Sequence, residues 1–223
     1  MIRYAIFDVD GTILDSMFIW EEAGEKMLRD RGLIPKPGLI NAMLHMSMEE
    51  GAAYVKETYH LQETVEEILD KILEIINHFY REEAGFKKDA GELLKELHRQ
   101  NVKMVIATSG NAKLAGAALE RLGVRDYFER IFTCGEIGAG KSKPDIFFAA
   151  ADFLGSSPET TWVFEDATHA VRTAKKYGFK VTAIYDDSSK NDWEEIKALG
   201  DVVLDQEDSY LEFFEKANKI EGK

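Results

Sequence analysis

The chain has 223 residues, 45% of them hydrophobic, and 41 acidic side chains against 28 basic ones leave a net charge of −13. This length fits one large domain or two small ones, with enough buried surface to need no disulfides. The negative charge repels phosphate backbones, so we expect no nucleic-acid partner.

The start of the chain and its single cysteine, Cys134, indicate the cellular compartment of the protein. One cysteine excludes a disulfide framework within the chain. No basic start precedes a long apolar stretch, and no run approaches the roughly 20 apolar residues of a membrane span. We therefore expect a cytoplasmic protein with no membrane partner.

Short apolar runs predict the strands of a buried parallel sheet. In chain order they cover 4–7, 103–107, 130–133, 161–164, 180–185 and 201–204. Helical patterns lie between them, each followed by glycine, at 112–122, 145–154 and 167–177. A glycine just past the last helical residue is the usual helix stop. This alternation predicts an α/β fold, a Rossmann-like parallel sheet core with helices on both faces.

Residues 16–86 interrupt the alternation with a purely helical pattern. Ser47 and Thr64 each begin a capping-box sequence, the signature of a helix start. After Thr64, apolar residues at helical spacing form a stripe made of Leu69, Ile72, Leu73, Ile76 and Phe79. We expect a small all-helical domain at 16–86 that contains no strand. It is inserted after the first strand of a discontinuous core domain, 1–15 and 87–223.

Reactive groups follow several of the predicted strands, where ligands bind in an open parallel sheet. They are Asp8, Asp10, Thr108, Ser109, Gly110, Lys141, Glu165 and Asp166, with Lys141 after a glycine-rich turn at 135–140. Crowded carboxylates repel one another, and a magnesium ion relieves this because it prefers carboxylate and water oxygens. One carboxylate can then attack phosphorus while a second moves protons.

The segment from Asp8 to Ser16, read as D-V-D-G-T-I-L-D-S, resembles the first motif of the haloacid dehalogenase superfamily of phosphatases and phosphomutases. Three later segments resemble its other motifs in the same order. They are 106–109 (I-A-T-S), 141–147 (K-S-K-P-D-I-F) and 163–167 (V-F-E-D-A). The resemblance covers essentially the whole chain and implies that the helical insert is a cap over the active site.

By this resemblance Asp8 is the nucleophile and a Mg²⁺ ligand, and Asp10 is the general acid and base. Asp10 also binds the metal, through its backbone carbonyl. Asp166 ligates the metal with support from Glu165. Thr108 acts on the phosphoryl group, which Gly11, Ser109 and Gly110 help to bind.

The phosphate-binding lysine has two candidates, because Ser142 stands where the family usually has proline. Counting back from Pro144 places Lys141 at the family position. Lys143 is the alternative, although it lies close to the expected start of the following helix.

The resemblance implies a Mg²⁺-dependent phosphohydrolase acting on a small phosphorylated metabolite, most often a sugar phosphate, and we expect a monomer. The alternative within the family is a phosphomutase like β-phosphoglucomutase. Those enzymes usually carry histidine and arginine where this chain has Trp20 and Met48. Trp20 could line the pocket or anchor the cap. An alternative from another class is a non-catalytic phosphate-binding or signalling module.

Overall fold

The computed structural model describes residues 2–43 and 46–221. The chain forms two compact units, which we treat separately. The sheet unit consists of Met1–Asp15 and Ala84–Lys223, and the helical unit is Ser16–Glu83. Among the described residues, no helix combines the length and the apolar character that crossing a membrane requires.

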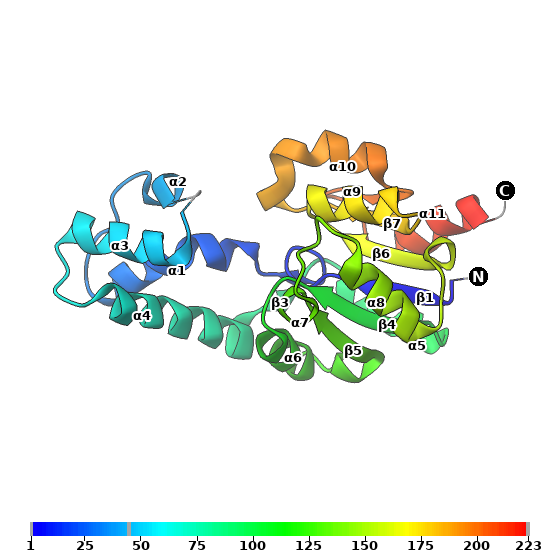
Figure 1. The fold of residues 1–223 in the computed structure, drawn as a ribbon, viewed down its shortest axis with the longest axis horizontal. Coiled ribbons are helices and arrows are strands. Elements are labelled where there is room, and N and C mark those ends of the chain that lie inside the picture. Colours follow the sequence, from blue (N-terminus) through cyan, green and yellow to red (C-terminus); the bar gives the residue numbers. More distant parts are fainter. Residues whose placement is uncertain (1, 44–45, 222–223) are drawn as a thin grey trace. The chain divides into compact units, whose positions relative to one another are not determined.

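The sheet unit is built on a six-stranded sheet with the order β5-β4-β1-β6-β7-β8 (Figure 1). Its strands are β1 (Tyr4–Phe7), β4 (Lys103–Thr108), β5 (Phe128–Thr133), β6 (Thr161–Glu165), β7 (Lys180–Ile184) and β8 (Val202–Leu204). Every neighbouring pair is parallel. The predicted α/β fold with a parallel sheet is therefore confirmed, and β1 lies at its centre between β4 and β6.

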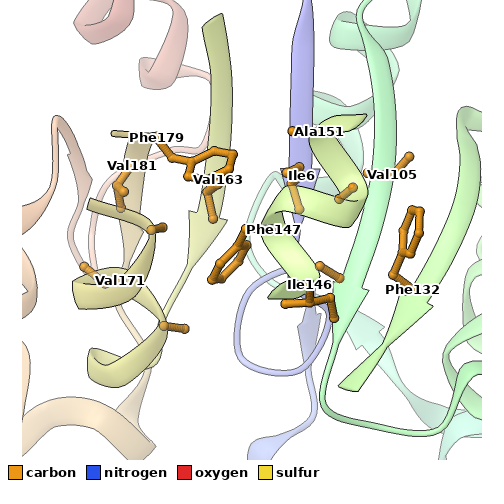
Figure 2. Packing of buried hydrophobic residues seen from close by; sticks show 14 of the residues in the cluster. Ile6, Val105, Phe132, Ile146, Phe147, Ala151, Val163, Val171, Phe179 and Val181 are labelled. Atoms are coloured by element: carbon orange, nitrogen blue, oxygen red, sulfur yellow. The ribbon is translucent and has the colours of Figure 1, made fainter. Parts of the chain in front are cut away.

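Helices cover both faces of this sheet. On one face α8 (Asp145–Leu154), α9 (Thr168–Lys176) and α10 (Trp193–Leu199) share a buried apolar cluster with the strands. Figure 2 shows Ile146 and Phe147 of α8 beside Ile6 of β1 in this cluster. On the other face, Phe213 of α11 (Glu212–Glu221) contacts the rings of Trp162 and Phe164, with centroids 5.1 and 4.8 Å away.

The remaining helices of the sheet unit are α5 (Ala90–Arg99), α6 (Ala112–Arg121) and α7 (Cys134–Ile137). Short 3₁₀ segments lie at Arg125–Tyr127, Pro158–Thr160 and Asp187–Asp192. The predicted glycine-rich turn at 135–140 is partly wrong, because α7 occupies its first residues. Thr133 begins this short helix by accepting a hydrogen bond from the Glu136 amide. Gly138 ends it with a positive φ of 75°.

The helical unit contains α1 (Met17–Asp30), α2 (Leu39–Met43), α3 (Met48–Tyr59) and α4 (Val65–His78), followed by a π-helical turn, Phe79–Glu83. Both predicted capping boxes are present at Ser47 and Thr64. The predicted stripe on α4 is partly wrong. The buried side chains of α4 are Ile68, Ile72 and Ile76, whereas Leu73 is exposed. Ile68 lies one helical turn before Ile72 and so points to the same face.

The two connections between the units run side by side as a pair of two-residue antiparallel strands, β2 (Leu14–Asp15) and β3 (Gly85–Phe86). The expectation of no strand within 16–86 is therefore wrong at β3. A strand this short carries no alternating pattern, so nothing in the sequence marks it.

Candidate active site

The segment after β1 forms a tight turn that aims its carboxylates beyond the end of the sheet. The amides of Thr12, Ile13 and Leu14 all donate to the carbonyl of Val9, at 3.3, 2.9 and 2.9 Å. Gly11 has a φ of 78°, a conformation that glycine adopts without steric strain. The turn therefore fixes the backbone on both sides of Asp10.

Three carboxylates meet at the carboxyl ends of β1 and β6. Asp8, Glu165 and Asp166 each offer an oxygen within 4.8 Å of the others. Glu165 and Asp166 are buried, and Asp8 is 9% exposed. Asp166 Oδ1 accepts a 2.8 Å hydrogen bond from the Thr12 hydroxyl. Glu165 Oε2 accepts from the amides of Asp166 and Ala167 at 3.2 and 3.3 Å. One oxygen of each of these two side chains is thus fixed by a protein donor.

Lys141 lies within this cluster and is 3% exposed. Its ammonium donates hydrogen bonds to Asp8 Oδ1 and to Glu165 Oε1. Lys143, the other candidate from the sequence, is exposed. The fold therefore brings Lys141 to the carboxylates.

The charges of the cluster do not balance. Burial raises the pKa of Glu165 to about 7, even though Lys141 acts in the opposite direction. Burial, with the neighbouring Glu165 and Asp8, raises the pKa of Asp166 well above its usual value. Burial disfavours the charge on Lys141, but Asp8 and Glu165 outweigh that effect and raise its pKa. A divalent cation with oxygen ligands would supply the missing positive charge, so the residues present fit Mg²⁺.

The second group of predicted residues lies at the end of β4. Thr108 is buried, and its hydroxyl accepts a 2.9 Å hydrogen bond from the Gly110 amide. A methyl group added to Gly110 would lie 3.1 Å from Asp10 Oδ2 and 3.2 Å from Thr108 Oγ1. The Asp10 carboxylate and the Thr108 hydroxyl therefore both border Gly110. Ser109 is exposed, and its hydroxyl lies 3.4 Å from the Cys134 sulfur.

The structure adds residues to the site that the sequence did not assign. Thr12 belongs to the first motif, but only the fold shows its bond to Asp166. Tyr210 donates a 2.8 Å hydrogen bond to the carbonyl of Thr12, and no sequence pattern near residue 210 predicts this contact. Burial and then the charge of Lys141 lower the pKa of His169, the second residue of the helix that follows Asp166.

Trp20 anchors the helical unit internally. Its indole N–H donates a 3.1 Å hydrogen bond to the Tyr80 hydroxyl in the π-helical turn. Its side chain is nevertheless 37% exposed. Trp20 therefore anchors α1 to the π-helical turn within the helical unit, and the exposed part of its ring remains available for other contacts.

The chain is similar to known proteins over most of its length. The family model described as haloacid dehalogenase-like hydrolase matches residues 5–184. A phosphorylated carbohydrates phosphatase of Thermotoga maritima is 25% identical over 175 residues, which are 78% of this chain and 81% of the relative. The fructose-1-phosphate phosphatase YqaB of Escherichia coli is 26% identical over 189 residues, covering 79% of this chain and 94% of the relative.

A solved structure has the same fold as this chain. It belongs to a Thermotoga maritima protein proposed to be a β-phosphoglucomutase, and it matches with a TM-score of 0.80 over 99% of both chains. The sequence identity is 21%, so this likeness concerns the architecture.

Proposed function

The chain belongs to the haloacid dehalogenase-like hydrolases, and from this membership we propose that it is a Mg²⁺-dependent phosphatase for a small phosphorylated metabolite. The observation that carries the proposal is the buried cluster of Asp8, Glu165 and Asp166 with Lys141 at the carboxyl edge of the sheet. Relatives named as phosphatases of phosphorylated carbohydrates and of fructose 1-phosphate favour a sugar phosphate as the substrate.

The metal would be held by the carboxylates of Asp8 and Asp166 and the backbone carbonyl of Asp10, with Glu165 supporting this shell. When bound, it neutralises the phosphoryl oxygens and the carboxylates around them. The remaining positive charge comes from Lys141, which is fixed between Asp8 and Glu165. We expect the Thr108 hydroxyl to donate to the phosphoryl group, beside the predicted phosphate-binding residues Gly11, Ser109 and Gly110.

In the first half of the reaction, an Asp8 carboxylate oxygen attacks phosphorus and the bond from phosphorus to the ester oxygen breaks. Asp10 donates its proton to the departing oxygen, which leaves as an alcohol. An aspartyl-phosphate on Asp8 remains. In the second half, Asp10 takes a proton from water, the resulting hydroxide attacks phosphorus, and the bond to Asp8 breaks to release phosphate.

The first test is the hydrolysis of p-nitrophenyl phosphate by the purified protein in MgCl₂ and in EDTA. We expect activity in MgCl₂ that is lost in EDTA and in Asp8→Asn. Asp152→Asn is the matched control, because Asp152 lies exposed on α8, away from the cluster. A panel of sugar phosphates and nucleoside monophosphates then tests the substrate class, with higher kcat/KM expected for the sugar phosphates.

Other outcomes would separate the alternatives. Interconversion of β-glucose 1-phosphate and glucose 6-phosphate would make the protein a phosphomutase. Folded protein that hydrolyses no phosphate ester in MgCl₂ would overturn the proposal and favour a non-catalytic phosphate-binding role.

A further inference from the structure

A short chain of buried hydrogen bonds leads from the C-terminal part of the sequence to the carboxylate cluster. The Tyr210 hydroxyl donates to the backbone carbonyl of Thr12 at 2.8 Å, across 198 residues of sequence. The Thr12 hydroxyl then donates to Asp166 Oδ1 at 2.8 Å. We infer that Tyr210 is a positioning residue that orients the Asp166 carboxylate through Thr12. Where the inference concerns Mg²⁺, it rests on the proposed function.

All three members of this chain are sheltered from solvent. Tyr210 is 6% exposed, Thr12 1% and Asp166 3%. A buried carbonyl that loses its donor has little access to water as a replacement, so it must move or stay unpaired. The Tyr210 bond therefore fixes the peptide plane that follows Thr12.

The orientation of that plane matters because Thr12 belongs to the nucleophile turn. Its amide already donates to the Val9 carbonyl, so its backbone is held at both ends. The side chain of a residue fixed in this way has few accessible positions from which its hydroxyl can reach Asp166. Partners behind a metal ligand set its orientation and its affinity for the ion.

The position of Tyr210 is itself set by contacts away from the cluster. Lys216 on α11 donates to the Val203 carbonyl at 3.0 Å and to Asp208 Oδ2 at 2.6 Å. The Ser209 amide donates to Glu212 Oε1 at 3.2 Å. These bonds hold the segment that carries Tyr210 without drawing on the site residues. The phenol also stays protonated, because burial and then Asp166 raise its pKa well above the usual value.

The test compares Tyr210→Phe with Tyr185→Phe, which makes the same chemical change at a hydroxyl bonded to exposed Asp187. Mg²⁺ affinity is measured by calorimetric titration, and kcat and KM are measured with p-nitrophenyl phosphate. Loss of a supporting partner should weaken Mg²⁺ binding and lower kcat about tenfold in Tyr210→Phe, with little change in KM. Tyr185→Phe should match the wild type.

A double-mutant cycle separates this role from a general loss of stability. Thr12→Val removes the hydroxyl through which Tyr210 acts, so adding Tyr210→Phe to it should change Mg²⁺ affinity by less than about twofold. Thr12→Ser keeps the hydroxyl, and in that background Tyr210→Phe should again cause about a tenfold loss.

Two results would overturn the inference. One is Mg²⁺ affinity in folded Tyr210→Phe equal to that in Tyr185→Phe. The other is an equal effect of Tyr210→Phe with and without the Thr12 hydroxyl. Wild-type protein that binds Mg²⁺ but hydrolyses no phosphate ester would refute the proposed function alone, because the calorimetric test of Tyr210 needs no substrate.

Discussion

Without a bound metal, the stability of the buried carboxylate cluster depends on the positive charge of Lys141. It donates to Asp8 and Glu165 from a position that is 3% exposed. Desolvating an ammonium is costly unless nearby carboxylates compensate, and here Asp8 and Glu165 provide that compensation. Removing the lysine would leave the carboxylates buried with no adjacent cation.

We therefore expect Lys141→Met to lower the free energy of unfolding in EDTA by about 3 kcal/mol at neutral pH, because it breaks a buried ion pair. Urea unfolding followed by circular dichroism measures this. Lys143→Met, an exposed change of the same kind, should stay within about 0.5 kcal/mol of the wild type. Equal stability of the two variants would contradict this account of Lys141.

At the residue scale, the sequence located the groups at the strand ends but not the bonds among them. Asp8, Glu165 and Asp166 follow apolar strands, and strand ends in a parallel sheet converge. The structure brings these groups together with Lys141, while their catalytic roles stay predictions. The contact between Tyr210 and Thr12 could not be anticipated, because it joins a loop to a turn that share no strand pairing.

At the element scale, local signals mark the beginnings of α3 and α4 well. In each capping box the Ser or Thr hydroxyl accepts from the N3 amide, and the N3 glutamate accepts from the N-cap amide. The two reciprocal bonds at Thr64 are 3.1 and 2.8 Å long. The box satisfies backbone donors that the helix itself leaves unpaired.

Thr64→Ala should lower the free energy of unfolding of the helical unit by about 1 kcal/mol, because it removes this cap. Thr64→Ser keeps an acceptor hydroxyl and should retain most of the stability. Urea unfolding followed by the fluorescence of Trp20, a tryptophan of the helical unit, reports the change. An alanine variant as stable as the serine variant would show that the cap contributes little.

Elements with strong periodic or apolar patterns were predictable, and elements without them were not. The sheet strands are short buried runs, so their positions were found within a few residues. β3 has two residues and pairs only because the chain returns beside Leu14 and Asp15. The predicted stripe on α4 is partly wrong, because Leu73 fits the spacing but faces solvent.

At the scale of the whole molecule, the net charge of −13 means that the acidic side chains repel one another, and any cation reduces this repulsion. Sodium ions act by screening, which depends on ionic strength alone. Magnesium should act in a second way, by binding the buried cluster of Asp8, Glu165 and Asp166. The two effects can be separated at equal ionic strength.

About 10 mM MgCl₂ and about 30 mM NaCl have the same ionic strength, so screening is equal in the two solutions. We expect Tm to be about 5 °C higher in MgCl₂, since a ligand that binds only the folded state stabilises it. In Asp166→Asn the difference between the salts should shrink to near zero. A wild-type Tm that is equal in both salts would argue against a metal site in the cluster.

The central position of β1 also determines when the sheet can form during synthesis on the ribosome. Tyr4 pairs with Lys103 of β4 on one side and with Thr161 of β6 on the other. The strand β1 therefore lacks both partners until β4 and β6 have been synthesised. At typical elongation rates the delay before β6 emerges is roughly 10 to 30 s. The helical unit is synthesised in this interval and needs no part of the sheet for its internal contacts. The nascent chain thus carries β1 as an unpaired apolar segment during this interval, and we expect chaperones that bind exposed apolar segments to protect it.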